Sequence, residues 1–468
     1  MQPAASIFKA YDIRGVVDET LTDEVVTLIG AALGLLIQRA GKSECVVGRD
    51  GRLSGPRLVD ALATGLLSVG IDVIDIGQVP TPVVYYGTVK TGCGTGVAVT
   101  GSHNPPQYNG LKMMVAGATL WGEAIQEIRS LIVSGAAHAA MEKAHRVGVR
   151  RLDTEMTNQF TQAIIEDIHL QRPMSVVIDA GNGVAGGMAP ELLRALGCRV
   201  TALYCEVDGH FPNHHPDPAH PENLQDLIAA VQAGDAEIGL AFDGDGDRLG
   251  VVTRSGAIIW PDRQLMLYAA DVLKNRPGAE IIFDVKCSRH VARWVRHHGG
   301  IPVMWKTGHS LIKAKLKETG APLAGEMSGH IFFNDRWFGF DDALYTAARL
   351  LEIVSRFENP SAELEGLPNC PSTPELQLAT REGENVRLVE RLRAEGDFPS
   401  AIERITIDGI RVEYADGFGL ARPSNTTPVV VLRFEADSDE ALQRIQAEFR
   451  SNLQRIGLSL NIPLELPF

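Results

Sequence analysis

"ECVVGRDGRLSGPRLVDALATGLLSVGIDVIDIG", residues 44–77, decides the fold class of this chain. It begins with a short β-rich run, continues with a helix-length amphipathic segment from Gly55, and ends in a second β-rich run from Ile71. Strands that alternate with helices in this way build parallel or mixed sheets covered by helices on both faces. The stretch therefore predicts an α/β architecture.

The same alternation extends through most of the chain. Upstream, Thr22 and the acids that follow it predict the start of an apolar helix ending at Gly41. Further β-rich runs, separated by helix-length segments, are SVVID (175–179), EIGLAF (237–242), EIIFDV (280–285) and IPVMW (301–305). Near the C-terminus the pattern changes to a hairpin-like stretch at 403–436, flanked by expected helices at 384–394 and 438–452.

Three connector-like segments divide the chain. They are the Ala/His/Lys-rich segment 134–151, the end of RLGVVTRSG near 255, and the Pro-containing segment near 367. We expect four domains, at residues 1–147, 148–254, 255–367 and 368–468, because 468 residues exceed what one core usually supports. The predicted fold is three consecutive α/β domains with mixed sheets plus a smaller C-terminal α+β domain, arranged around a central cleft.

Composition narrows the class of partner. The net charge of −14 argues against nucleic acid or an anionic membrane surface as a general partner. The six cysteines form no CxxC pair, which favours reduced thiols. The N-terminus lacks the layout of a signal peptide, and the apolar run at 25–37 is too short to span a bilayer. We therefore expect a cytoplasmic protein.

The strongest local motif is AFDGDGDRLG, residues 241–250. Asp243, Asp245 and Asp247 alternate with glycines directly after an apolar strand, and carboxylates this close repel each other unless a cation lies among them. Hard oxygen ligands suit Mg²⁺. An EF-hand does not fit, because Arg248 and Arg254 stand where that loop needs glycine and an acid. A solvated acidic turn is the alternative, and the position at a strand end favours the metal.

A lone serine stands in AVTGSHNPPQYNGLKMM, residues 98–114. A strand is expected to end before Ser102, which we predict to be exposed at its tip, ahead of two prolines and without an obvious base beside it.

Two weaker motifs carry polar side chains. In GEMSGHIFF (325–333), Glu326, Ser328 and His330 lie on one side of an extended segment and suit sugar hydroxyls, although a polar turn has the same pattern. In RPSNTTP (422–428), an arginine, hydroxyls and an amide suit a phosphate, although an ordinary capped turn is equally compatible.

Two further motifs have a structural explanation. Gly181, Gly183 and Gly186 match GxGxxG, and Glu206 lies about 20 residues beyond, which raises an NAD-linked oxidoreductase as an alternative. Tight strand-to-helix packing needs the same glycines, and we favour it. The histidine-rich stretch 208–223 has four prolines and no regular zinc spacing, so we predict an ordered Pro-rich loop.

Taken together, the motifs TGSHNP, DGDGDR, GEMSGH and RPSNTTP, in this order and about 140, 80 and 100 residues apart, resemble the α-D-phosphohexomutase superfamily. The chain is most similar to its bacterial phosphomannomutase/phosphoglucomutase group. FKAYDIRG near the N-terminus and KTGHS at 306–310 also resemble that family, so that the likeness covers essentially the whole chain.

The resemblance implies a phosphotransferase that interconverts hexose 1-phosphates and hexose 6-phosphates of mannose and glucose. Ser102 would carry a phosphoryl group, and Ser102, Asp243, Asp245 and Asp247 would hold Mg²⁺. Two transfers would pass through a hexose 1,6-bisphosphate, which also serves as activator. The implied partner is a small phosphosugar, with no nucleic acid or membrane, and the protein is expected to be a monomer.

The resemblance also implies roles for individual residues. Glu326 and Ser328 would contact the 3- and 4-hydroxyls, and Lys112, His309 and His330 are the leading acid and base candidates. The other catalytic residues implied are Arg14 and Arg248. The other substrate-binding residues implied are Tyr11, Asn104, Lys286, Arg422, Ser424, Asn425 and Thr426.

Two other functions stay open. Phosphoglucosamine mutases share the plan but usually have GEQSGH, so Met327 argues against that substrate without excluding it. A non-enzymatic sugar-phosphate-binding module has little support because the serine and all three aspartates are present.

Overall fold

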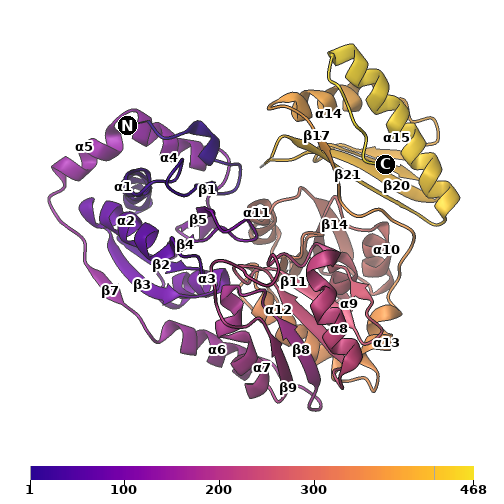
Figure 1. Ribbon diagram of the computed structural model, residues 1–468, viewed down its shortest axis with the longest axis horizontal. Helices are drawn as coiled ribbons and strands as arrows, with labels where there is room; N and C mark the ends of the chain where they lie inside the picture. Colours follow the sequence, from indigo (N-terminus) through magenta and orange to yellow (C-terminus); the bar gives the residue numbers. More distant parts are fainter. Residues whose placement is uncertain (1, 426) are drawn as a thin grey trace.

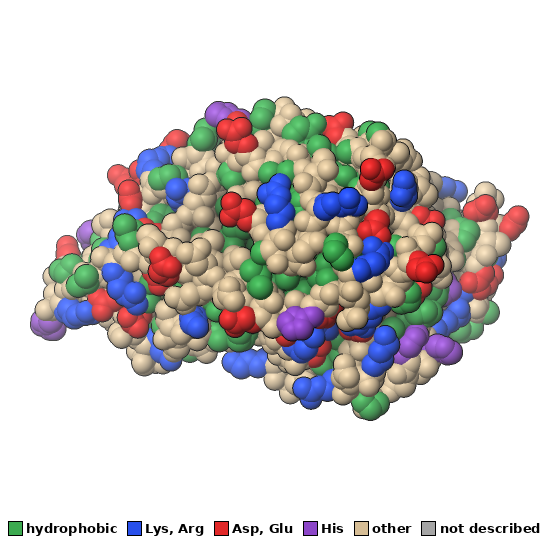
Figure 2. Space-filling model, turned by 90° about the horizontal axis from the view of Figure 1, so that it is seen from below, with side chains coloured by type: hydrophobic (Ala, Val, Ile, Leu, Met, Phe, Trp, Pro, Cys, Tyr) green, Lys and Arg blue, Asp and Glu red, His purple; other side chains and the backbone are tan. Residues whose placement is uncertain are grey.

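The computed structural model of the chain describes residues 2–425 and 427–468 (Figure 1). Four sheets follow one another along the sequence, and helices cover them. Within the described residues, no helix is both long enough and apolar enough to cross a membrane. On the face shown in Figure 2, basic side chains are interspersed with acidic ones rather than gathered in one patch.

The first domain contains a mixed sheet with strand order β1-β5-β4-β2-β3-β7, and β6 pairs with β5. The central strands β4, β2 and β3 run parallel, whereas β5 runs antiparallel to β4 and β1. Its strands are β1 (Ile13–Val16), β2 (Glu44–Arg49), β3 (Asp72–Gln78), β4 (Gly96–Val99), β5 (Tyr108–Val115), β6 (Ala118–Thr119) and β7 (Arg150–Leu152). Its helices are α1 (Asp23–Arg39), α2 (Gly55–Ser68), α3 (Thr81–Lys90), α4 (Glu123–Val133) and α5 (Ala136–Lys143). As predicted, Thr22 caps α1, accepting a hydrogen bond from the Val25 amide at 3.3 Å.

The second domain has the strand order β12-β11-β10-β8-β9, with β8 parallel to β9 and β10. Its strands are β8 (Ser175–Asp179), β9 (Arg199–Leu203), β10 (Ile238–Phe242), β11 (Leu249–Thr253) and β12 (Ile258–Ile259). Its helices are α6 (Met156–Asp167), α7 (Ala189–Ala195) and α8 (Gln225–Ala233). Strand β10 is buried along its whole length, as expected for a central strand covered on both faces.

The third domain has the strand order β14-β13-β15-β16, in which only β16 is antiparallel to its neighbour. Its strands are β13 (Glu280–Asp284), β14 (Ile301–Trp305), β15 (Leu323–Gly325) and β16 (Ile331–Phe333). Its helices are α9 (Pro261–Asn275), α10 (Arg289–His297), α11 (His309–Thr319), α12 (Ala343–Val354) and α13 (Pro360–Glu365). Every residue of α12 is buried, because this helix packs inside the molecule.

The fourth domain is an antiparallel sheet, β17-β21-β20-β19-β18, with two helices. Its elements are β17 (Leu376–Ala379), α14 (Glu384–Glu395), β18 (Glu403–Ile405), β19 (Ile410–Tyr414), β20 (Gly417–Pro423), β21 (Val429–Ala436) and α15 (Asp439–Leu460). Helix α15 continues beyond the end predicted at 452, since Leu453 and Ile456 remain on its buried face. The predicted fold class, three α/β domains with mixed sheets and a C-terminal α+β domain, is confirmed.

The exact domain boundaries remain predictions. Strand β7 lies beyond the boundary predicted at 147, yet it pairs in parallel with β3 of the first sheet. Strand β12 lies beyond the boundary predicted at 254, yet it pairs with β11 of the second sheet. In both places the chain completes one sheet before it enters the next domain.

The cores of the domains are not equally connected. One continuous cluster of buried apolar side chains runs through the first three domains, from Val46 to Leu367, and the first domain has a further cluster of its own on the other face of its sheet. The fourth domain has a core of its own, formed between its sheet and its two helices. A small cluster of Val285, Phe418 and Leu420 joins the third domain to the fourth. In Figure 1 the fourth domain, at the yellow end of the colour scale, accordingly stands apart from the rest.

Candidate active site

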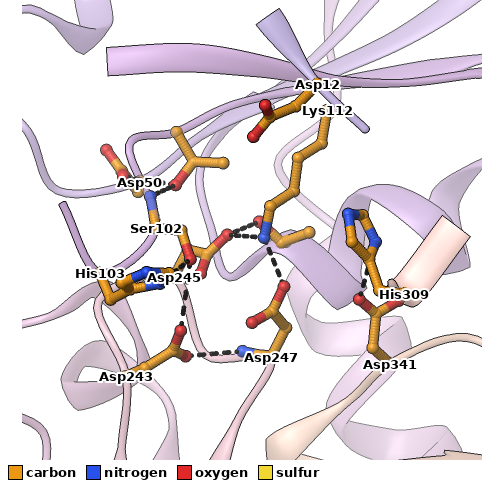
Figure 3. Close-up of polar contacts among 12 residues, drawn as sticks. Asp12, Asp50, Ser102, His103, Lys112, Asp243, Asp245, Asp247, His309 and Asp341 are labelled. Carbon is orange, nitrogen blue, oxygen red and sulfur yellow. Dashed lines mark hydrogen bonds and ion pairs between the residues drawn. The ribbon is translucent and has the colours of Figure 1, made fainter. Parts of the chain in front are cut away.

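The predicted motifs of the first three domains follow the carboxyl ends of strands. Ser102 comes after β4, Asp243 after β10, and Glu326 after β15. In open α/β sheets, the carboxyl ends of the parallel strands are the usual place for a ligand site. The three domains turn these ends toward one another, so that motifs far apart in the sequence meet (Figure 3).

Ser102 is not exposed at the end of its strand, as the sequence suggested, but only 2% accessible. Its hydroxyl oxygen lies 3.5 Å from Asp243 Oδ2 of the second domain and 3.2 Å from His103 Nδ1. The backbone of Ser102 is left-handed, with φ of 50°. The loop that carries Asp243, Asp245 and Asp247 packs directly on Ser102, because a Cβ on Gly244 would collide with the Ser102 carbonyl oxygen.

Two buried side chains that the sequence analysis missed hold the loop that carries Ser102. Asp50 Oδ2 accepts hydrogen bonds from the Thr100 hydroxyl at 2.7 Å and from the Gly101 amide at 3.2 Å. Arg52, only 1% exposed, donates to the backbone carbonyls of the loop. Its acceptors are Ser102 (2.8 Å), Asn104 (2.6 Å), Pro105 (2.7 Å) and Tyr108 (2.9 Å). The pair therefore fixes the loop at both ends.

The histidine-rich loop also contacts this structure. The Phe211 ring covers the Arg52 guanidinium, whose carbon lies 5.3 Å from the ring centroid. The Pro216 carbonyl accepts from the Gly244 amide at 3.1 Å, which joins the loop to the metal motif. His214 pairs with Asp179 at 2.9 Å rather than with another histidine. Among the described residues, the four histidines of this loop form no common metal cluster.

The three aspartates are completely buried and converge. One carboxylate oxygen of each lies within 4.8 Å of the others. Asp243 Oδ1 accepts from the amides of Asp247 (3.0 Å) and Arg248 (3.1 Å), which folds the loop around it. Burial and repulsion by the other two carboxylates raise the pKa of Asp243 well above its usual range.

Lys112 of β5 reaches into this cluster. Its ammonium donates to Asp245 Oδ2 at 2.7 Å and to Asp247 Oδ2 (Figure 3). Although burial favours the neutral form, the two carboxylates keep the pKa of Lys112 above its ordinary value, so that it is charged. The Asp245 and Asp247 Oδ1 atoms are buried and find no hydrogen-bond partner among the described residues. Two free oxygens and one strongly repelled carboxylate fit a bound Mg²⁺.

Two histidines lie near the junction of the DGDGDR and GEMSGH motifs. His330 Nε2 lies 3.4 Å from Asp247 Oδ1 and accepts from Arg248 Nε at 3.2 Å. Its Nδ1 lies 2.9 Å from the Ser328 hydroxyl. His309, whose ring centroid is 5.6 Å from that of His330, contacts Asp341 at 3.4 Å. Burial and the nearby Lys313 ammonium lower the pKa of His309, which favours its neutral form.

Glu326 of the GEMSGH motif is buried but keeps one carboxylate oxygen without a hydrogen bond. Glu326 Oε1 accepts from the Gly308 amide at 2.6 Å. Its Oε2 has no hydrogen-bond partner among the described residues, and His330 Nδ1 lies 3.3 Å from it. Glu326 and Ser328 thus meet at one edge of His330, where a hydroxyl can donate to the carboxylate.

The predicted phosphate-binding side chains form a second group, between the third and fourth domains. Arg422 Nε pairs with Asp408 at 2.9 Å, and Lys286 pairs with Glu375 at 2.8 Å. Asn425 donates to the Tyr11 hydroxyl, which donates in turn to the Thr307 carbonyl at 2.8 Å. Ser424 lies in the same loop, whereas Thr426 lies outside the described residues. Acids therefore hold both cations of this group.

The two groups are joined through the first domain. The Tyr11 ring packs edge-on against His309, with centroids 6.2 Å apart. Arg14 donates to Asn104 in the Ser102 loop and to Asp12 at 2.5 Å. The structure thus gathers the described site residues that the sequence predicted into two groups: one around Ser102, the expected reacting end, and one around Arg422, the expected binding end.

The GxGxxG glycines pack against the protein itself. A Cβ on Gly186 would collide with the Cys205 carbonyl oxygen, and one on Gly183 would lie 3.0 Å from Gly244. Gly181 has φ of 49° and lies against Pro216. Close packing therefore accounts for all three glycines, in agreement with the packing interpretation.

Comparison with known proteins gives one family across the chain. Residues 5–138, 157–256 and 260–369 match the family models of phosphoglucomutase/phosphomannomutase, alpha/beta/alpha domains I, II and III. Residues 375–452 match the model of the C-terminal domain of the same family.

Individual relatives agree with these matches. A phosphoglucomutase of Neisseria meningitidis is 54% identical over 452 residues, covering 96% of this chain and 97% of the relative. A phosphomannomutase/phosphoglucomutase of Pseudomonas aeruginosa is 53% identical over 460 residues, covering 98% of each. The crystal structure of a phosphoglucomutase/phosphomannomutase family protein from Burkholderia thailandensis, 58% identical, has a TM-score of 0.92 and covers 97% of this chain and 98% of that one. The chain therefore belongs to the phosphoglucomutase/phosphomannomutase family, within the α-D-phosphohexomutase superfamily.

Proposed function

We propose that this enzyme interconverts hexose 1-phosphates and hexose 6-phosphates of mannose and glucose, with Ser102 as the carrier of the phosphoryl group. The contact between Ser102 Oγ and Asp243 Oδ2 at 3.5 Å carries the assignment. It joins a hydroxyl of the first domain to the carboxylate cluster of the second, inside a site from which water is largely excluded.

The carboxylate cluster fits Mg²⁺, with Asp243, Asp245, Asp247 and the phosphorylated Ser102 as the proposed ligands. A phosphate on Ser102 adds about −1.5 to −2 charge. When bound, Mg²⁺ offsets this charge and polarises the phosphoryl group. Lys112 and Arg248 supply further positive charge, and Arg248 lies 3.9 Å from Asp243.

In the first transfer, the bond between Ser102 Oγ and phosphorus breaks, and a bond forms between phosphorus and the free hydroxyl oxygen of the sugar. The hydroxyl loses its proton to a base, and Ser102 Oγ regains a proton. His330 suits the sugar hydroxyl: burial and Arg248 favour its unprotonated form, whereas Asp247 and Glu326 favour its protonated form and raise its pKa overall. Lys112 is fully engaged with two aspartates and serves as a fixed charge.

The product of this step is a hexose 1,6-bisphosphate, which turns around and returns its other phosphate to Ser102. The same bisphosphate, supplied from solution, would phosphorylate an empty Ser102. Throughout, Arg422, Lys286, Tyr11, Ser424, Asn425 and Thr426 are proposed to hold the phosphate that is not reacting. The separate core of the fourth domain supports its movement during this turn.

Glu326 and Ser328 are proposed to bind the 3- and 4-hydroxyls, which mannose and glucose present identically. The free Oε2 of Glu326 supports this role. Asn104, held by Arg14 beside Ser102, is proposed to contact the substrate at the reacting end.

Phosphorus NMR of the products tests the proposal. The protein is supplied with Mg²⁺, a trace of bisphosphate, and α-mannose 1-phosphate, α-glucose 1-phosphate or glucosamine 1-phosphate. We expect 6-phosphate from the first two sugars, and Ser102→Ala should form none. Conversion of glucosamine 1-phosphate alone would instead assign the chain as a phosphoglucosamine mutase. Full activity of the Ser102→Ala variant would contradict the carrier role.

Two general properties complete the proposal. Since one chain supplies all four motifs, a monomer is sufficient for catalysis, and we propose that state; sedimentation analysis tests it. All six cysteines are unpaired, which supports work in a reducing compartment such as the cytoplasm.

A further inference from the structure

A second cluster of potential metal ligands lies at the junction of the third and fourth domains. His290 is the second residue of α10, Cys370 lies in the connector between α13 and β17, and Glu435 lies on β21 (Figure 1). A ring nitrogen, the thiol sulfur and a carboxylate oxygen all lie within 4.8 Å of one another. No role in the proposed reaction falls to any of these three residues.

We propose that this cluster binds a thiophilic divalent cation of the Zn²⁺ or Co²⁺ type. Imidazole, thiolate and carboxylate are the ligands that Zn²⁺ takes in four-coordinate sites, and a water completes the set. Mg²⁺ prefers oxygen ligands and is expected at the three aspartates instead. The two sites thus select different cations.

The hydrogen bonding of these side chains supports a metal ion bound between them. The Nε2 atom of His290 is buried and has no hydrogen-bond partner within the described part of the chain. Buried polar atoms nearly always have a partner, so this one calls for an explanation. The Cys370 sulfur lies beside the Glu435 carboxylate, within the same cluster. On binding, the sulfur–hydrogen bond is replaced by a sulfur–metal bond, and the proton leaves to solvent.

The surroundings hold the ligands in place. Glu435 Oε1 accepts from the Ser288 hydroxyl at 3.0 Å and from the Arg289 amide at 3.1 Å, which orients the carboxylate. The connector that carries Cys370 runs alongside β21, since the Ala436 amide donates to the Pro371 carbonyl at 3.0 Å. The nearby guanidiniums of Arg289 and Arg433 are already paired with acids, so that their charge is largely offset.

The ligands come from both sides of a domain junction. His290 belongs to the third domain and Glu435 to the fourth, with Cys370 between them. An ion bound to all three stabilises the arrangement in which they meet. If the fourth domain moves during the reorientation of the bisphosphate, the ion opposes that movement and slows turnover. This second half of the inference rests on the proposed function.

Cobalt spectroscopy tests the site directly. Reduced, metal-stripped protein in excess Mg²⁺ is titrated with Co²⁺. We expect one equivalent to produce a thiolate-to-cobalt charge-transfer band in the near ultraviolet, which oxygen ligands alone cannot give. Cys370→Ser should abolish the band. His290→Gln should weaken Co²⁺ binding more than about 100-fold, since losing a residue that only orients a ligand already costs about 10–100-fold. Cys205→Ser, which removes the other partly exposed thiol, should leave the band unchanged.

Absence of the band, or its survival in Cys370→Ser, would overturn the site.

Zn²⁺ inhibition of the Mg²⁺-saturated enzyme then tests the link to movement. Cys370→Ser should need at least about tenfold more Zn²⁺ for half-inhibition than the wild type. Equal inhibition of both, with the band intact, would overturn the link but not the site. Because the band needs no turnover, it is independent of whether the proposed reaction is correct.

Discussion

Arg52 lies directly behind Ser102: its Nη2 donates to the Ser102 carbonyl oxygen at 2.8 Å, although the two residues are 50 positions apart. The same guanidinium reaches three more carbonyls of the loop, and its Nε pairs with Asp50 at 3.1 Å. One side chain therefore determines where the serine hydroxyl stands relative to Asp243.

The first prediction concerns this contact. Arg52→Lys keeps the charge but cannot reach all four carbonyls, so the loop should shift relative to the carboxylate cluster. A displacement of about 1 Å can cost about 100-fold in rate. We expect kcat to fall by that order while KM changes little, because Arg52 reaches Asn104 only through its backbone carbonyl and contacts none of the residues proposed to bind the distant phosphate. Steady-state kinetics with α-glucose 1-phosphate measures both.

Arg349→Lys is the matched control for the Arg52 variant. Arg349 is equally buried but pairs with Asp335, away from Ser102. It should lower the melting temperature without the selective loss of kcat. If both variants lost activity only in proportion to their stability, Arg52 would be a purely structural residue.

The second prediction concerns the carboxylate cluster. Asp243→Asn retains the oxygen that accepts the amides of Asp247 and Arg248, and it removes a charge that its neighbours repel. In metal-free buffer, the melting temperature should therefore stay the same or rise. Turnover with Mg²⁺ should fall by at least about 100-fold, since metal polarisation contributes several kcal/mol. Calorimetry and kinetics measure the two effects, and a clear loss of stability without metal would contradict the repulsion.

The third prediction concerns the binding end. Arg422→Ala removes the guanidinium that pairs with Asp408 and leaves the distant phosphate without its charge-assisted contact. A loss of about 2–3 kcal/mol corresponds to about a 30- to 140-fold rise in apparent KM. Both 1-phosphate and 6-phosphate substrates should be affected, and more bisphosphate should escape into solution. Arg404→Ala, an exposed arginine of the same domain, should change neither quantity. An effect on only one of the two substrates would refute a shared phosphate site.

The fourth prediction is a substitution that should lower the apparent KM rather than raise it. Glu375 pairs with Lys286 at 2.8 Å and competes with a phosphate for that ammonium. Because the glutamate is partly exposed, its pairing is worth at most about 1 kcal/mol. Glu375→Gln should therefore lower the apparent KM by up to about fivefold. Lys286→Met should raise KM, and a rise in the Glu375 variant as well would show that the glutamate supports binding rather than competing with it.

Much of the site was predictable because its polar side chains follow apolar strands. The run DGDGDR after β10 predicted converging carboxylates, and the order of four motifs predicted the family. The support of the Ser102 loop was not predictable, since Arg52 recognises backbone carbonyls, which every sequence has. The burial of Ser102 depends on Gly244, which is 142 positions away in the sequence, and only the packing of two domains reveals it.

The pairs that hold the binding end escaped prediction for a similar reason. Asp408 and Glu375 lie in no motif, and their partners are 14 and 89 positions away. His103 stands next to Ser102 in the sequence, and its contact with the serine hydroxyl could have been suspected. Burial lowers the pKa of His103 well below its ordinary value, so that it is neutral beside the hydroxyl. The length of α15 was underestimated: the polar Asn452, where the helix was expected to end, lies on its buried face, and Leu453 and Ile456 continue that face.

The separate core of the fourth domain has a calorimetric consequence. The first three domains share one apolar cluster, to which the first domain adds a second on the other face of its sheet, and they should melt as a single cooperative unit. The fourth domain, whose core is separate, can melt on its own. On the proposed function, a bound phosphosugar would touch both units and stabilise the state in which they are together. Heating the free protein should then give two heat-absorption peaks, and saturating substrate should merge them into one.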